Sequence, residues 1–241
     1  MTYKKEIIDC LKDMKTISKN NTEIVVKAKF GPSKNIRIPL ILDEQLACFI
    51  AAIIEDGHLQ KEKFQIILDG FDKELIEKFR IICINIFNKE FNINQWIENK
   101  KNRYRLTIDS KAIHTIIKNI FEIPTGKKSN IVKIPEFIKD SNKRIKSAFI
   151  IGIMVTEGGR RMRGFGLSTS SKQLWEDLIQ LFNDIGIEVK KDKWIYKKYN
   201  KEYYGISFKK ENIHIINKKC KNKEVKNILL ECKNFKEGYI S

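Results

Sequence analysis

The sequence predicts an α+β fold built from two similar halves, and three observations lead to this prediction. Helical and strand-like periodicities alternate along the 241 residues, the order of elements that begins near residue 43 returns near residue 141, and an apolar helical segment ending in an acid and a glycine occurs twice. A chain of this length corresponds to one large domain or two small ones. With 42% hydrophobic residues it buries a substantial core.

The N-terminal extension, residues 1–40, is expected to form a helix followed by a hairpin. Apolar residues recur at helical spacing over residues 3–14, and they alternate strictly with polar or flanking residues over 24–30 and again over 36–40. A Gly-Pro-Ser break at 31–33 separates the two alternating runs, as expected of a turn. The pattern assigns no role to this segment.

The first repeat, residues 41–121, opens with a helix over 43–57, in which Asp43 is a suitable N-cap and Gly57 a stop signal. A strand at 58–68, a helix at 72–87, a strand at 90–97, a turn at 99–102, a strand at 103–109 and a helix at 110–121 are expected to follow. The strand at 103–109 alternates most clearly, because Tyr104, Leu106 and Ile108 fall on one face and Arg103, Arg105 and Thr107 on the other. A sheet with one apolar and one cationic face suits a phosphate backbone.

A linker at 122–140, with two prolines, a glycine and several lysines, separates this repeat from a second one at 141–241. The second repeat is expected to contain a helix at 141–156, a strand at 159–169, a helix at 171–185, strands at 187–195 and 202–208, and a helix from about 210. The order matches that of the first repeat, which predicts a pseudo-two-fold pair.

The charge of the chain indicates a polyanionic partner. Lys and Arg number 47 against 30 Asp and Glu, which gives a net charge of +17 and a pI near 9.6. The alternative is that the many Lys, Asn and Ile residues reflect the codons of an A/T-rich genome.

Cysteine usage and hydropathy indicate a cytoplasmic protein, or an organellar one if an intron encodes it. The five cysteines are odd in number and show no C-x-x-C spacing, so they are expected to be reduced core residues. No apolar run approaches the ~20 residues of a membrane helix, and the N-terminus has no secretory signal. No membrane association is expected.

The duplication is sharpest in two segments, 46–59 and 147–160. An offset of 101 residues places Asp56 on Glu157, Gly57 on Gly158 and Ala51 on Gly152. Small residues four apart on one face let two such helices pack closely, and parallel packing brings both acids together at the helix C-terminal ends.

Two carboxylates at the negative ends of helix dipoles need a compensating cation, and a hard divalent ion such as Mg²⁺ is the natural choice. The competing interpretation is two unrelated surface acids.

With both motif copies in order on a basic chain, residues 43–235 resemble the LAGLIDADG family of homing endonucleases, of the monomeric two-motif type. The resemblance implies a duplicated αββαββα fold whose two saddle-shaped antiparallel sheets, related by pseudo-two-fold symmetry, straddle the DNA major groove. It also implies that Asp56 and Glu157 bind divalent metal, Mg²⁺ or Mn²⁺, and cut both strands. Two positions depart from the family pattern: Glu157 replaces the commoner Asp, and Ala51 stands where glycine is usual.

The candidate catalytic residues are Asp56, Glu157 and Arg160, with Gly57 and Gly158 as backbone of the metal site. Arg160 follows Glu157 by three residues, close enough to stabilise charge on a phosphate. The candidate DNA-contacting residues are polar or basic residues that follow the two motifs or lie on outward strand positions: Gln60, Lys61, Lys63, Gln65, Arg103, Arg105, Arg161, Arg163, Lys190, Lys193 and Tyr203. The lysine-rich segment 218–227 is expected to be a solvated helix face or a non-specific phosphate contact.

These residues and the resemblance together predict a site-specific, Mg²⁺-dependent double-strand DNA endonuclease. It is expected to be a monomer that takes part in intron or intein homing at a long pseudo-palindromic or asymmetric site. Two other functions remain open on the same scaffold: a catalytically silent nucleic-acid-binding protein, or a maturase that assists splicing of intron RNA. An enzyme acting on tRNA is a third possibility with no specific support.

Overall fold

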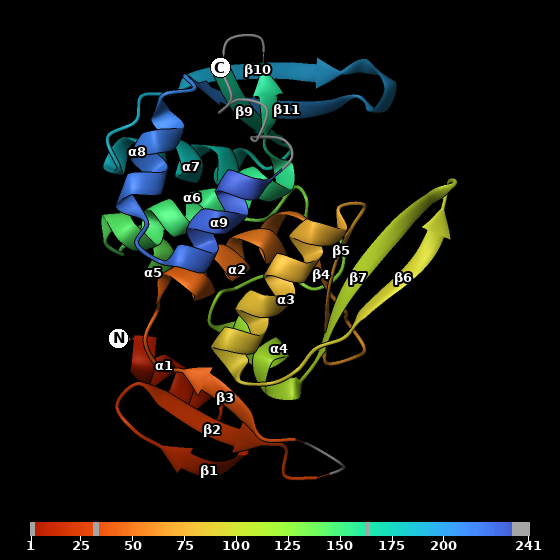
Figure 1. Ribbon diagram of the computed structural model, residues 1–241, viewed down its shortest axis with the longest axis vertical. Coiled ribbons are helices and arrows are strands. Elements are labelled where there is room, and N and C mark those ends of the chain that lie inside the picture. Colours follow the sequence, from red (N-terminus) through yellow and green to blue (C-terminus); the bar gives the residue numbers. More distant parts are fainter. Residues whose placement is uncertain (1–2, 31–33, 162–163, 233–241) are drawn as a thin grey trace.

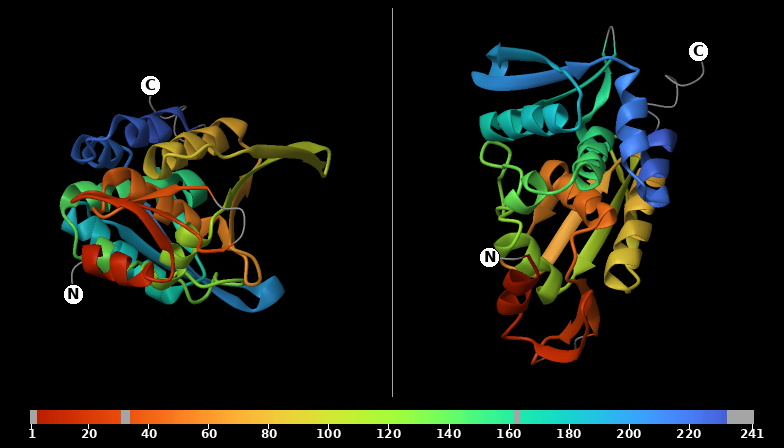
Figure 2. Two further views of the ribbon diagram at one scale, coloured as in Figure 1. Left: turned by 90° about the horizontal axis from the view of Figure 1, so that it is seen from below. Right: turned by 90° about the vertical axis from the view of Figure 1, so that its left-hand side faces the viewer.

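The structure is a computed structural model that describes residues 3–30, 34–161 and 164–232. Two similar α+β halves are stacked on each other, and a small N-terminal sheet lies at the end of the first half that is remote from the second (Figures 1 and 2). Both halves and the N-terminal sheet share one continuous apolar core. The predicted α+β duplication is confirmed.

The first half has the order αββαββα and a four-stranded antiparallel sheet in the order β4-β5-β7-β6. Its elements are α2 (Glu44–Glu55), β4 (Gly57–Leu59), β5 (Gln65–Gly70), α3 (Lys73–Phe87), β6 (Ile93–Glu98), β7 (Lys101–Asp109) and α4 (Lys111–Asn119). The short helix α5 (Glu136–Lys139) belongs to the connection between the halves.

The second half repeats this topology, with a sheet in the order β10-β11-β9-β8. Its elements are α6 (Lys143–Glu157), β8 (Gly159–Arg161), β9 (Gly164–Thr169), α7 (Lys172–Asp184), β10 (Lys190–Tyr196), the 3₁₀ turn η1 (Lys197–Tyr199), β11 (Lys201–Phe208), α8 (Asn212–Lys219) and α9 (Lys223–Glu231).

Each stretch expected to be one strand after a motif is in fact a pair of strands. In the first half the β4–β5 turn spans residues 60–64, which contain no glycine or proline to mark it, and Gln60 N–H closes it on Gln65 O at 3.0 Å. The helix expected from about 210 is also divided. Cys220 is extended between α8 and α9, and the backbone N–H groups of Lys221 and Asn222 both donate to the Glu44 carboxylate.

The N-terminal extension has a third strand in addition to the expected helix and hairpin. Its elements are α1 (Tyr3–Cys10), β1 (Lys15–Lys19), β2 (Glu23–Lys27) and β3 (Ile36–Pro39), with the strands in the order β1-β2-β3. Every residue of β1 is exposed, so this edge strand carries no apolar alternation by which the sequence would reveal it. Buried residues of β2 and β3 join the common core, and Arg37 Nε donates to Ile86 O at 2.9 Å.

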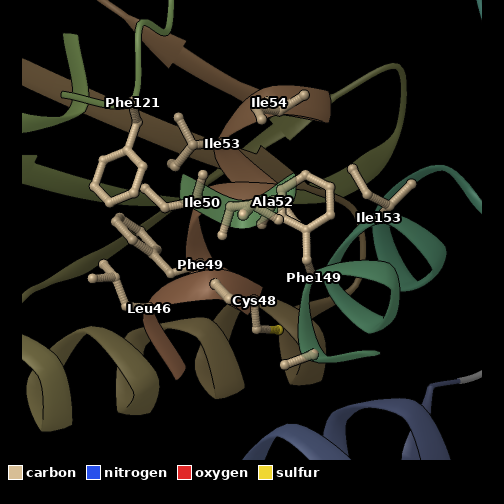
Figure 3. Packing of buried hydrophobic residues seen from close by; sticks show 14 of the residues in the cluster. Leu46, Cys48, Phe49, Ile50, Ala52, Ile53, Ile54, Phe121, Phe149 and Ile153 are labelled. Carbon is tan, nitrogen blue, oxygen red and sulfur yellow. The ribbon is translucent and has the colours of Figure 1, made fainter. Parts of the chain in front are cut away.

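The two motif helices, α2 and α6, pack against each other in parallel at the centre of the molecule. At their N-terminal ends Arg144 pairs with the buried Glu44 carboxylate at 2.7 Å. A Cβ on Gly152 would lie only 2.4 Å from Cys48 O and 2.6 Å from Ala51 Cβ, so the helices touch where Gly152 has no side chain. Figure 3 shows Phe149 of α6 pointing toward Ala52 of α2 beside this contact. Glycine on one helix thus suffices for the close approach, which explains why alanine is accepted at position 51.

We expect Gly152→Ala to destabilise the protein by about 1–3 kcal/mol or more, because the new methyl group meets α2 backbone. Without this contact the substitution would stabilise an exposed helix by about 1 kcal/mol, so the sign of the change is diagnostic. Urea unfolding measures it. Gly159→Ala is the matched control, since a Cβ there meets nothing within 4 Å. Equal stability of the two variants would contradict the close packing of α2 and α6.

Candidate functional site

The two motif acids meet where α2 and α6 end. Asp56 is the C-cap of α2, its N–H donating to Ala52 O at 3.0 Å, and Glu157 is the last residue of α6. The glycine after each acid lets the chain turn back over its own helix: a Cβ on Gly57 would lie 2.5 Å from Ile53 Cα, and one on Gly158 would lie 2.2 Å from Met154 O. The structure therefore brings together the acid from each half, as the paired motifs predict.

The carboxyl groups of Asp56 and Glu157 are close enough for each to shift the pKa of the other. Both residues are exposed at the surface where the two helices end. Loss of hydration raises the pKa of Asp56, and loss of hydration together with the Asp56 charge raises the pKa of Glu157 to about 7. Two carboxylates sharing one site cannot both ionise without a counter-ion.

A lysine from the linker supplies the nearest protein cation. Lys128 is buried, and its Nζ donates to the backbone carbonyls of Ile54 and Glu55, at 2.9 Å to the latter. Burial lowers the pKa of Lys128, while the charges of Glu55, Asp56 and Glu157 act in the opposite direction. The ammonium thus offsets the negative C-terminal end of α2 and the acids beside it.

Glu55 is a third carboxyl group at this site. Its Oε1 is buried and has no hydrogen-bond partner among the residues that the structure describes. Loss of hydration raises the pKa of Glu55 to about 8. Sequence reasoning missed both Glu55 and Lys128. The acid doublet Glu55-Asp56 was a visible signal, but nothing local separates Lys128 from its exposed neighbour Lys127.

The donor set fits a hard divalent cation. The carboxylates of Asp56 and Glu157, one from each half, converge where α2 and α6 end. The last backbone carbonyls of these two helices have no partner within the helix and are further oxygen donors. Within the described residues no group of three or more His, Cys, Asp or Glu side chains forms a complete metal cage. Mg²⁺ typically takes one or two carboxylates and completes its shell with water and substrate phosphates, so Asp56 and Glu157 are the residues that would hold it.

The outer face of the first sheet carries the predicted arginines. Antiparallel register places Arg105 opposite Asp69, while the apolar residues of β7 are buried on the other face. Asp69 accepts hydrogen bonds from both Arg103 and Arg105, at 2.8 Å from Arg105 Nη2, and Arg103 also pairs with Glu98. The sequence did not indicate Asp69. The two guanidinium groups are therefore oriented by protein carboxylates on this face.

The other first-repeat candidates surround the β4–β5 turn. Lys61 and Lys63 are exposed there, and Gln60 closes the turn through its backbone. Gln65 uses its side-chain amide to donate to Asp109 Oδ1 at 2.7 Å.

The second-repeat candidates divide between two faces. Lys190 and Tyr203 share one face of the β10–β11 hairpin, where Tyr203 stacks on Trp194 with ring centroids 6.0 Å apart. Lys193 lies on the opposite face, paired with Glu202 at 2.9 Å. Figure 1 shows this hairpin projecting from the body of the second half.

The basic residues after the second motif are only partly described. Register sets Arg160 opposite Phe165, so the two residues lie on the same face of the sheet. Phe165 is buried, whereas Arg160 is exposed. Arg161 lies in β8 opposite Gly164, and Arg163 lies outside the described residues. The catalytic role of Arg160 stays a prediction.

Comparison with known proteins places the second repeat in a defined family. The LAGLIDADG-like domain matches residues 144–228, which contain the second motif and its sheet. Residues 144–228 thus form a LAGLIDADG-like domain. The solved homing endonuclease I-DmoI, in complex with DNA and Mn, is 20% identical with a TM-score of 0.55 over 73% of this chain and 97% of that one. The DNA-bound homing endonuclease I-WcaI is 15% identical with a TM-score of 0.50 over 78% and 87%. These likenesses show that the chain has the fold of these homing endonucleases.

Curated relatives match over short parts of their length. The replication factor C small subunit of Methanocaldococcus jannaschii is 30% identical over 164 residues, which are 68% of this chain and 9% of that protein. A DNA polymerase of Thermococcus kodakarensis is 26% identical over 72% of this chain and 10% of its own. The chain thus spans about a tenth of the length of these relatives. No helix is long and apolar enough to cross a membrane within residues 3–30, 34–161 and 164–232.

We expect Lys128→Met to destabilise the metal-free protein by about 3–5 kcal/mol, because it leaves buried carbonyls and acids without their cation. Glu55→Gln in the same background should recover part of the loss by removing one acid. Chemical denaturation in EDTA measures both effects. Lys127→Met is the matched control, since Lys127 is exposed. If the two lysine variants are equally stable, Lys128 does not offset the acids.

Proposed function

We propose that this protein is a monomeric, site-specific double-strand DNA endonuclease of the homing type that uses Mg²⁺ or Mn²⁺. One observation carries the proposal: Asp56 and Glu157, one acid from each half, meet at the joint C-terminal ends of α2 and α6. Because the halves are related by pseudo-symmetry, a paired site at their boundary suits a substrate with two antiparallel strands. A net charge of +17 supports the same substrate.

Each part of the site has a task in phosphodiester hydrolysis. Asp56 and Glu157 hold the divalent ion, which when bound supplies Lewis-acid polarisation of the phosphoryl oxygen, an activated water and charge stabilisation of the leaving oxygen. Lys128 holds the end of α2 in place and limits the repulsion among the acids. The arginines ordered by Asp69 are suited to guanine or phosphate contacts.

The comparisons support a homing role. Segments similar to this chain occur within a replication factor C subunit, a DNA polymerase and an A-type ATP synthase subunit, and they cover only 9%, 10% and 12% of those proteins. A mobile element that inserts into different genes would leave similar short segments within long proteins of different function. Intron or intein homing is the corresponding activity.

The first experiment is to incubate the purified protein with a complex pool of DNA fragments, in Mg²⁺ and in parallel in EDTA, and to sequence the ends that appear. Ends that require Mg²⁺ and converge on one long site are expected, and they would also supply the target sequence. Tight DNA binding without any new ends would contradict the nuclease proposal. It would favour the silent binding protein, and preferential binding of structured intron RNA would favour the maturase.

We expect Asp56→Asn to reduce cleavage at least about 100-fold, on the scale of losing one preorganised electrostatic group. DNA binding should persist, because no strand or basic residue is altered. In EDTA the variant should melt at a higher temperature than wild type, since the substitution removes one of the crowded acids. Ca²⁺ should stabilise wild type but not the variant.

Calorimetry and a gel-based cleavage assay make these measurements. Asp13→Asn, which removes an exposed acid of the N-terminal extension, is the matched control. Cleavage by Asp56→Asn at the rate of the control would show that Asp56 does not hold the catalytic ion.

A further inference from the structure

A groove separates the N-terminal sheet from the outer face of the first repeat's sheet. Lys27, Phe30 and Lys34 line one wall, and Gln65, Arg105 and Thr107 line the other. The second wall is the face of β5 and β7 that is turned away from the apolar core. The N-terminal sheet therefore borders the surface on which the predicted DNA contacts lie.

The groove is lined by more basic than acidic residues. Lys27, Lys34, Lys89 and Lys111 line it, and none of the four takes part in an ion pair within the described part of the chain. The two acids of the groove are engaged by other groups: Glu90 pairs with Arg80 at 2.9 Å, and Asp109 accepts from Gln65 at 2.7 Å.

Like charges stand next to each other at this groove. Lys89 Nζ donates to the backbone oxygen of Asp109 at 3.1 Å, and burial and then the neighbouring Lys34 lower the pKa of Lys89. Lys15 of β1 stands directly opposite Lys27 of β2. Such pairs cost free energy in the isolated protein, and a polyanion lying between them would relieve the cost.

The N-terminal sheet is held firmly enough to place these lysines at fixed positions. Its buried residues, including Val26 and Ile36, belong to the core shared with the first repeat. Arg37 Nε bonds Ile86 O at the end of α3, and α1 packs against α4. The N-terminal sheet lies at the end of the first half that is remote from the second half (Figures 1 and 2).

We propose that the N-terminal sheet and this groove form a docking surface for the phosphate backbone of duplex DNA that flanks the cleavage site on the first-repeat side. The inference rests on the proposed function, since it extends the same duplex beyond the two central sheets. Duplex DNA is the occupant because the groove continues the outer face of β5 and β7 and presents separated, unpaired lysines.

The test compares two variants that each lose three positive charges. One is Lys34→Gln, Lys89→Gln and Lys111→Gln in the groove. The matched control is Lys5→Gln, Lys12→Gln and Lys143→Gln, three exposed lysines outside the groove and outside the candidate DNA contacts. Affinity for a random-sequence DNA duplex, longer than the two central sheets can cover, is measured over a series of salt concentrations. Thermal unfolding verifies that both variants fold. This is expected because the three groove lysines form no ion pair with any residue that the structure describes.

The groove variant should lose about 10- to 100-fold in affinity at roughly 0.1 M salt, and its log–log salt slope should fall by up to about 2.7, at about 0.9 per phosphate contact. The control should lose much less. Equal losses in the two variants, with wild type binding tightly, would overturn the docking surface and leave the nuclease proposal standing. Wild type that fails to bind any duplex, or that prefers structured RNA, would overturn both.

Discussion

The structure depends on the close approach of α2 and α6 at Gly152. Because this residue has no side chain, Cys48 and Ala51 of α2 come within contact of α6 backbone. The resulting parallel pair forms the centre of the core that joins the two halves, and each half carries its own sheet away from this axis. The same packing determines that both helices end at one place. A small residue in the helix interior, unfavourable for the helix itself, is thus required by the assembly of the two halves.

Bringing two helix ends together creates an electrostatic cost at the candidate site. Asp56, Glu157 and Glu55 crowd around the negative ends of α2 and α6, where the helix dipoles disfavour acids. The Lys128 ammonium offsets part of this cost, and the raised pKa of Glu157 reflects the remaining repulsion. A divalent cation bound between the acids would remove this repulsion. The strained charge arrangement is therefore the feature that most directly supports a metal-dependent function.

Positive charge is distributed in two different ways over the outer surfaces. Arg103 and Arg105 are held by Asp69 and Glu98, which fixes the directions of their guanidinium groups at the cost of neutralising part of their charge. The groove lysines, including Lys34 and Lys111, form no ion pair with an acid in the described part of the chain. Oriented groups near the centre suit recognition of particular bases, whereas unpaired lysines at the flank suit attraction to any phosphate backbone.

The sequence by itself determined the duplication, the two motif helices, the acid pair and the alternation of 103–109, because each is written in a short stretch with its own periodicity or offset. The tertiary structure alone decided that Lys128 binds the C-terminal end of α2 beside the acids and that Asp69 orients two arginines. It likewise decided that Arg160 lies on the same sheet face as Phe165. It also decided that exposed residues 15–19 form an edge strand. These features arise between segments far apart in the chain or from backbone pairing without burial. Neither leaves a local hydrophobic pattern to read.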